Sequence, residues 1–182
     1  MDSMKKKLWI IVWVVVACVA SFAVFNDYWI SKKKAEMYKI AENCYFINDV
    51  KYPSYSQLKY IALNELSFDE AEKIVSVCGL TKQSSSSSSV SYHGSCGNIS
   101  LQIINRANSD DLIRYTYLLR TNNKDYIRML RSEIMGENST KETANYAEGV
   151  IDDYWWVGLN VSDDMSTIFY QRFQSKKLPS RE

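Results

Sequence analysis

The sequence predicts an α+β protein in which an N-terminal transmembrane helix precedes a small domain with a ferredoxin-like βαββαβ layout plus one extra strand. Three observations lead to this fold class. Residues 8–25 are almost entirely apolar. Two later segments, which start near residues 58 and 112, share one order of strand, helix and strand. A last strand-like segment, residues 165–173, follows them. A mixed β-barrel with two helices is the alternative architecture.

The apolar run, LWIIVWVVVACVASFAVF, contains one polar residue, a serine. As a helix rising about 1.5 Å per residue it would extend about 27 Å, close to the hydrocarbon thickness of a bilayer. Lysine triplets flank it at 5–7 and 32–34, and Tyr28 and Trp29 suit an interfacial aromatic belt. We therefore predict a transmembrane signal anchor over residues 8–30.

The anchor divides the remainder of the chain. Residues 1–7 are a short cytoplasmic N-terminus, 31–44 a polar stalk, 45–175 an extracytoplasmic α+β domain and 176–182 a flexible tail. A short basic start before an apolar run is the usual export signal, so we expect a single-pass protein of the cell inner membrane with its C-terminal domain in the periplasm. The opposite orientation is the alternative, because lysines lie on both sides of the run.

Two other interpretations of the apolar run stay open. It can be a cleaved signal peptide, for which Ala20 or Ala23 offers a cleavage context. It can also be a lipoprotein signal, because the residues ending at Cys18 (VVAC) resemble a loose lipobox. Apolar residues continue past Cys18, which favours the uncleaved anchor.

The first repeated segment begins with residues 58–63 (LKYIAL), which are predicted to form a strand. Ser67 and Glu70 then have the spacing of a capping box, which starts a helix. The helix would bury one apolar face, formed by Phe68, Ala71, Ile74, Val75 and Cys78. Gly79 supplies the left-handed residue that ends it.

The second segment follows the same plan. Residues 112–119 (LIRYTYLL) are predicted as a strand, Asn123 as a helix N-cap and Gly136 as the helix end. The apolar stripe of this helix consists of Ile127, Leu130 and Ile134. Further strands are expected at residues 98–105 and 154–161, at matching places in the two segments.

Two polar stretches are predicted to be long loops. Residues 81–91 include six consecutive serines, and residues 137–150 lie at the matching place in the second segment. Both would emerge at one end of the sheet, where binding loops often lie. Tolerated insertions are the alternative interpretation.

Four cysteines are present, one of them inside the apolar run. In an oxidising compartment two of the other three would pair. We expect a disulfide between Cys78 and Cys96, because it would restrain the serine-rich loop, and Cys44 would then be a thiol available for an intermolecular bond and a dimer. Three reduced thiols in a cytosolic domain are the alternative.

The sequence contains little that indicates catalysis. His93 is the only histidine, and its spacing from Cys96 fits no usual zinc site. The adjacent acidic pairs lie at expected turns or helix starts, where carboxylates cap and solvate. We therefore predict no catalytic residue, no metal and no cofactor. Beyond residue 25 there are 19 Lys+Arg and 20 Asp+Glu, a balance that argues against nucleic acid as a partner.

The most unusual local cluster is Tyr154-Trp155-Trp156. On a strand the two tryptophans face opposite sides, so one would pack in the core and the other could contact a ligand. These three residues are the binding candidates.

Together these features predict a membrane-anchored periplasmic binding protein. It would be an accessory or regulatory subunit that binds another membrane or periplasmic protein, or a small hydrophobic ligand. A membrane-anchored immunity protein against a toxin is one alternative. A hydrolase that uses Cys96 and His93 is another.

Overall fold

The computed structural model describes residues 2–94, 99–106, 113–143, 145–152, 155–161 and 169–175. The chain forms two units, residues 1–39 and residues 40–182. The predicted tail, 176–182, lies outside the described residues.

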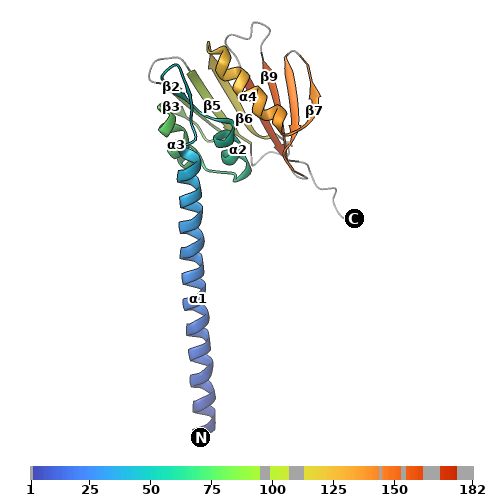
Figure 1. Cartoon of the computed structure of the whole chain (residues 1–182). Coiled ribbons are helices and arrows are strands. Elements are labelled where there is room, and N and C mark those ends of the chain that lie inside the picture. Colours follow the sequence, from blue (N-terminus) through green and yellow to red (C-terminus); the bar gives the residue numbers. More distant parts are fainter. Residues whose placement is uncertain are drawn as a thin grey trace. The chain divides into compact units, whose positions relative to one another are not determined.

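The first unit consists of helix α1 up to residue 39. The whole helix, Asp2–Ala41, is 40 residues long and unbroken (Figure 1). It runs through the predicted anchor and on through most of the predicted stalk. Its apolar side chains are exposed, Phe22 to 73% and Val24 to 70%. Val12–Ala41 is long and apolar enough to cross a membrane, which makes α1 a candidate single N-terminal span.

The second unit is an α+β domain. Its elements are the hairpin β1 (Tyr45–Ile47) and β2 (Val50–Tyr52), helices α2 (Tyr55–Leu63) and α3 (Phe68–Val75), a 3-10 turn at Ser76–Cys78, strands β3 (Leu80–Ser85), β4 (Ser89–Gly94), β5 (Ile99–Asn105) and β6 (Ile113–Thr121), helix α4 (Lys124–Gly136), and strands β7 (Asn138–Glu142), β8 (Tyr146–Val150), β9 (Trp155–Val161) and β10 (Phe169–Ser175). The capping box of Ser67 with Glu70 and the N-cap at Asn123 are confirmed. Gly79 has a left-handed φ of 79°, as its place after the helix predicts.

Strands β3 to β10 form one antiparallel sheet in the order β3-β4-β5-β6-β10-β9-β8-β7. The domain is therefore α+β, but the predicted ferredoxin-like layout is wrong, and the described strands close no barrel. Each half of the domain is instead a helix followed by a four-stranded meander. The sheet has more strands than predicted because both expected loops turn out to be hairpins.

The two halves repeat at a constant offset along the chain. Helix α3 begins at Phe68 and α4 at Lys124, and the same offset separates the first residues of β5 and β9 and those of β6 and β10. At the centre of the sheet Thr116 lies opposite Arg172, its own counterpart in the second half. The two halves are therefore related by a local two-fold axis that passes through the β6–β10 pairing.

Residues 58–63, predicted as a strand, lie in helix α2. The signal for a helix was the capping box of Ser54 with Gln57, which starts α2. Leu58, Ile61 and Ala62 follow at helical spacing and are fully buried.

The serine-rich segment forms the β3–β4 hairpin and not a flexible loop. Its turn is held by Ser86, whose hydroxyl accepts hydrogen bonds from the amides of Ser88 (3.4 Å) and Ser89 (3.1 Å). Residues 137–150 likewise form the β7–β8 hairpin. Both outer strands, β3 and β7, contain a register shift and are mostly exposed, which explains why they lack a hydrophobic pattern.

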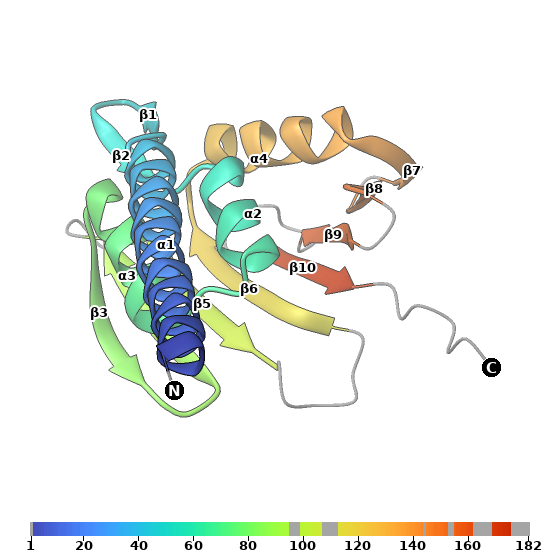
Figure 2. The ribbon, with the colours of Figure 1, turned by 90° about the horizontal axis from the view of Figure 1, so that it is seen from below.

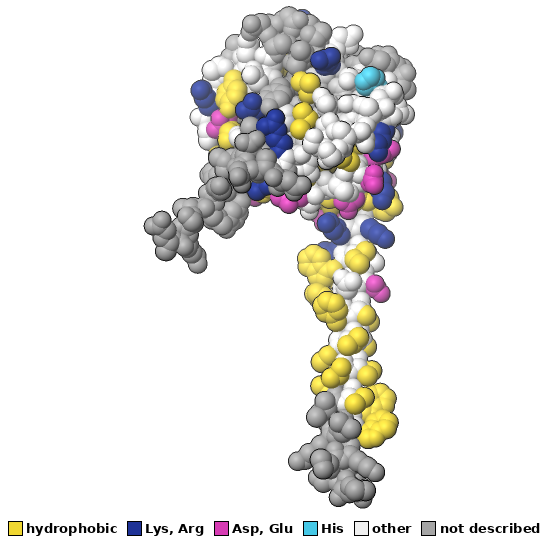
Figure 3. Space-filling model, turned by 180° about the vertical axis from the view of Figure 1, so that it is seen from behind, with side chains coloured by type: hydrophobic (Ala, Val, Ile, Leu, Met, Phe, Trp, Pro, Cys, Tyr) yellow, Lys and Arg dark blue, Asp and Glu magenta, His cyan; other side chains and the backbone are white. Residues whose placement is uncertain are grey.

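Helices α2 and α4 lie on one face of the curved sheet (Figure 2). Among the described residues of the domain, helices cover this face alone, and the opposite face is called the helix-free face. Seen from behind, the surface shows basic and hydrophobic side chains scattered among other side chains and backbone (Figure 3). The core lies between the helices and the sheet. Its largest buried side chains include Tyr92, Tyr115, Tyr117, Tyr126 and Phe173.

Four core tyrosines tie the sheet and α4 to the segment 53–68. Their hydroxyls donate to backbone carbonyls there: Tyr92 to Phe68 (3.3 Å), Tyr115 to Leu66 (3.4 Å), Tyr117 to Leu58 (2.9 Å) and Tyr126 to Pro53 (2.7 Å). Burial raises the pKa of each of these tyrosines, that of Tyr115 to about 12. The tyrosines therefore fill the core and also fasten the sheet and α4 to this segment.

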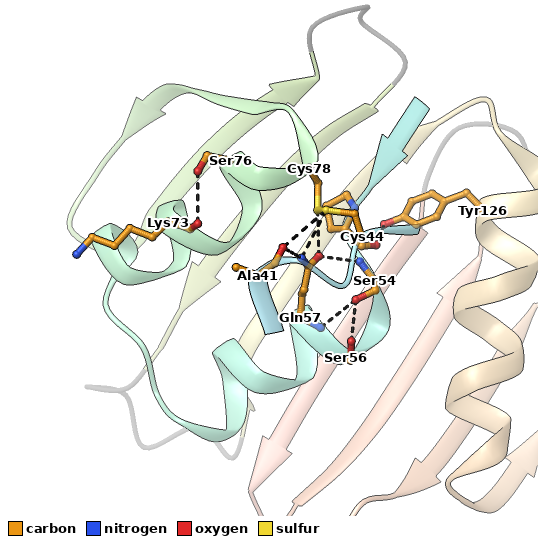
Figure 4. The surroundings of a disulfide bond; sticks show 10 residues. Ala41, Cys44, Ser54, Ser56, Gln57, Lys73, Ser76, Cys78 and Tyr126 are labelled. Atoms are coloured by element: carbon orange, nitrogen blue, oxygen red, sulfur yellow. Dashed lines mark hydrogen bonds between the residues drawn. A yellow bond between two sulfur atoms is a disulfide. The ribbon is translucent and has the colours of Figure 1, made fainter. Parts of the chain in front are cut away.

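The disulfide joins Cys44 to Cys78 (Figure 4). The predicted bond from Cys78 to Cys96 is therefore wrong, and Cys44 is not the intermolecular thiol that was expected. The reason is the unpredicted helix α2, which brings Cys44 beside the end of α3. Cys96 lies outside the described residues, and Cys18 is free and exposed.

Buried Gln57 completes the surroundings of the disulfide. Its amide nitrogen donates to the carbonyl of Ala41 (2.8 Å), and its amide oxygen accepts from the amide of Ser54 (2.9 Å). The same nitrogen lies 3.7 Å from Cys44 Sγ. One side chain thus joins the start of the domain, the cap of α2 and the disulfide.

We expect the double variant Cys44→Ala/Cys78→Ala to lose about 3–4 kcal/mol of unfolding free energy, because the disulfide closes a long loop of the unfolded chain. Its two cysteines are separated by 34 positions. The measurement is urea unfolding of the full chain in detergent micelles, followed by near-ultraviolet circular dichroism. Cys18→Ala is the control. Equal midpoints for the double variant and the unaltered chain under oxidising conditions would contradict a stabilising disulfide.

We also expect the free energy of unfolding to fall as the pH rises from about 10 to about 12. In that range tyrosines ionise in the unfolded chain, whereas folded Tyr115, with a pKa of about 12, keeps its proton. Tyr115→Phe should therefore reduce the slope of stability against pH in urea titrations. Tyr38→Phe, which removes an exposed hydroxyl from α1, serves as the comparison. An unchanged slope in Tyr115→Phe would contradict this origin of alkaline sensitivity.

Candidate functional site

The candidate site lies on the helix-free face, where strands β8, β9 and β10 run side by side. A row of directly paired residues crosses this face from Thr116 through Arg172, Gly158 and Glu148 to Lys141. Because alternate residues of a strand share a face, the neighbours two positions along each strand lie beside this row. The register therefore brings polar, charged and aromatic side chains from five strands together.

A shallow cavity of about 110 Å³ opens in this region. It is lined by Tyr146, Trp156, Gly158, Leu159, Asn160, Arg172 and Gln174. Gly158 forms the floor: a Cβ added there would lie 3.4 Å from the Tyr146 hydroxyl and 3.7 Å from the Trp156 ring. The two aromatic side chains thus flank a position that has no side chain of its own.

Glu148 is held in place by two hydroxyl groups. Tyr146 donates to its Oε2 at 2.5 Å, and Thr140 lies 3.1 Å from its Oε1. Burial, followed by the hydrogen bond to Glu148, raises the pKa of Tyr146 to about 12, while the nearby Arg172 acts in the lowering direction. Lys141 lies over the Tyr146 ring, 5.6 Å from its centroid. The tyrosine is therefore fixed as a neutral wall of the cavity.

Two polar side chains at this site are buried without a hydrogen-bond partner among the described residues. They are Gln174, through its Oε1, and Thr116, through its hydroxyl. Gln174 is 8% exposed and lines the cavity, directly opposite Trp156 on the neighbouring strand. A buried acceptor without a donor costs free energy, so Gln174 is a natural contact for a ligand that supplies an N–H or O–H group.

The structure places two of the three predicted binding residues on opposite faces of the sheet. The third, Tyr154, lies outside the described residues. Trp155 is half-buried and shares its side of β9 with buried Val157, which places it on the helix-covered face. Trp156 is half-buried on the opposite face and lines the cavity. The two tryptophans therefore face opposite sides of the sheet, as the sequence predicted.

Sequence reasoning missed the other side chains of the cavity, above all Tyr146, Arg172 and Gln174. Tyr146 lay in a predicted loop. The alternation of Arg172 and Gln174 around the apolar Phe173 was the available signal, because it indicates a strand with one polar face. Which strands lie beside it could not be read from that alternation.

His93 lies exposed on β4 and takes no part in the cavity. Its proposed catalytic partner, Cys96, lies outside the described residues. Within the described part of the chain, no three His, Cys, Asp or Glu side chains are grouped so that they could hold a metal ion.

No protein-family model, curated protein or solved structure matches this chain.

Two glycines of the second half should respond differently to substitution. An added Cβ at Gly149 would lie 2.9 Å from the backbone carbonyl of Ile134 in α4, so Gly149→Ala should cost about 2 kcal/mol of stability through overpacking. Gly158→Ala should change stability by less than about 0.5 kcal/mol, because its Cβ would make only ordinary contacts over the open cavity. Urea unfolding in micelles measures both. Equal losses for the two variants would contradict an uncovered cavity floor.

Proposed function

We propose that this chain is a single-pass, membrane-anchored binding protein. Its α+β domain lies in the periplasm and acts as an accessory or regulatory subunit that binds a partner through the helix-free face of the sheet. The observation that carries the proposal is the cavity over Gly158, where two aromatic side chains, an arginine and a buried acceptor without a partner among the described residues come together.

The exposed apolar surface of α1 supports the anchor. Trp13 and Phe25 are exposed to 64% and 60%, and their neighbours are similarly uncovered. Water-exposed apolar surface on this scale is unfavourable unless lipid or another protein covers it. A bilayer supplies such a cover for the apolar part of this candidate span, residues 12–30.

The disulfide supports the orientation. Stable structural disulfides form on the oxidising side of a membrane and are rare in the cytosol. Cys44 follows closely on the end of α1 at Ala41, so the disulfide includes one of the first residues of the domain. A domain held in the periplasm would keep this bond oxidised.

The chemistry of the cavity supports binding. Arg172 and Asn160 can donate hydrogen bonds, and Gln174 can accept one. Both Glu148 oxygens lie within hydrogen-bonding distance of hydroxyl groups, which leaves this carboxylate in a positioning role. Trp156 is the kind of amphipathic aromatic that anchors many binding surfaces.

The proposal is tested with cysteines introduced into the full chain after Cys18 and Cys96 are replaced by serine. Asn160→Cys places a thiol at the rim of the cavity, and Arg128→Cys places a matched, exposed thiol on α4. In cells of the source organism with a permeabilised outer membrane, a membrane-impermeant maleimide should label both. Labelling at position 160 should be at least fivefold slower in native membranes than after solubilisation, whereas the rate at position 128 should not change.

Labelling that requires opening of the inner membrane would overturn the periplasmic orientation. Equal rates at position 160 before and after solubilisation would overturn a partner-occupied sheet face. Trp156→Ala in the Asn160→Cys background should abolish the protection, because the aromatic anchor of the partner would be lost.

A further inference from the structure

The cavity over Gly158 is too small to enclose a whole ligand. Its volume is about 110 Å³, whereas pockets that bury drug-sized molecules measure about 300–1,000 Å³. It therefore suits a single terminal group, with the rest of the ligand lying along the exposed sheet face. This inference rests on the proposed binding function of the same site and asks which group enters.

The charges at the cavity favour an anion. Arg172 is the only charged side chain among the described residues that line it. Glu148, on β8 beyond the intervening strand β9, already lies within hydrogen-bonding distance of the hydroxyls of Tyr146 and Thr140. Lys141 adds a second positive charge in the same cross-strand row. The five N–H donors of a guanidinium form a planar fork that matches a carboxylate, so Arg172 can take a carboxylate in addition to other contacts.

The ligand must also supply a donor. Gln174 shares a face of β10 with Arg172 two residues away, and its buried Oε1 has no partner among the described residues. A group that carries a carboxylate close to an N–H would satisfy Arg172 and Gln174 together. The Trp156 and Tyr146 rings on either side of Gly158 offer apolar contact to a side chain between them.

We propose that the cavity binds the C-terminal residue of a peptide segment of the partner. The terminal carboxylate pairs with Arg172, the amide N–H of the same residue donates to Gln174 Oε1, and an apolar side chain lies over Gly158 against Trp156. Capture of a chain terminus by convergent polar groups is a recurring mode of peptide recognition. A free N-acyl amino acid has the same chemistry, and the experiment separates the two sources.

The test is isothermal titration calorimetry of the full chain in detergent micelles. The probes are acetyl-Ala-Ala-Leu, the same peptide with an amidated C-terminus, and N-acetyl-leucine. The free-acid peptide should bind at least tenfold more tightly than its amide, because the amide lacks the charge that Arg172 recognises. It should also bind more tightly than N-acetyl-leucine, because the preceding residues contact the sheet face.

Equal affinity for acid and amide would overturn carboxylate recognition. Tighter binding of N-acetyl-leucine than of the peptide would overturn the peptide terminus as the source and identify a small N-acyl amino acid instead.

Three variants test whether the peptide binds in the cavity over Gly158. Arg172→Gln should weaken the free-acid peptide at least tenfold and leave the weak affinity for the amide unchanged. Gly158→Ala, which is expected to fold normally, should weaken both peptides by filling the floor. Arg120→Gln is the matched control, because Arg120 is exposed on the same face of β6 as Thr116. Unaltered binding by Arg172→Gln, or an equal loss in Arg120→Gln, would overturn the assignment.

The outcome also distinguishes this inference from the proposed function. If no probe binds but Asn160→Cys is still protected in native membranes, the ligand class is wrong and the partner-binding face stands. If that protection is absent as well, both proposals fall.

Discussion

The antiparallel pairing of β6 with β10 is the interaction on which the rest of the domain depends. It joins two meanders that would otherwise be separate four-stranded sheets, and it sets Thr116 opposite Arg172. A slip of one residue would turn every side chain of one half to the other face. The core tyrosines of β6 would then point away from the helices. This register therefore determines both the core and the contents of the helix-free face.

The helix layer is held to this sheet by hydrogen bonds as well as by apolar packing. Strand tyrosines reach through the core to carbonyls at the start of α3 and within α2, and Tyr126 of α4 reaches the residue before the cap of α2. Gln57 and the disulfide then hold the beginning of the domain against the same helices. Helices as short as α2 and α3 are marginal alone, so these links let them serve as one cover for a large sheet.

Local signals in the sequence predicted local structure well and topology poorly. The capping box at Ser67 and the cap at Asn123 are encoded by residues close together in the sequence and are confirmed. The edge strands have no such signal, since exposed serines and threonines pair through backbone groups that composition does not reveal. Missing those strands led to the wrong layout. Treating the serine-rich residues 81–91 as a flexible loop in need of a restraint led to the wrong disulfide. Of the cavity, only Trp156 was identified, because the other walls depend on strand order.

The repeat explains why the cavity lies where it does. In β5, the positions that correspond to Gly158 and Trp156 of β9 are Gln102 and Ser100, at the offset that relates the two halves. Gln102 places a side chain where the second half leaves an open floor, and Ser100 offers no aromatic wall. The central pairing therefore gives the two halves a nearly symmetric scaffold, but the residues that differ between β5 and β9 make the helix-free face asymmetric. In the second half, Gly158 leaves an open cavity floor between the rings of Trp156 and Tyr146. Arg172, at the centre of the sheet, lies beside this floor.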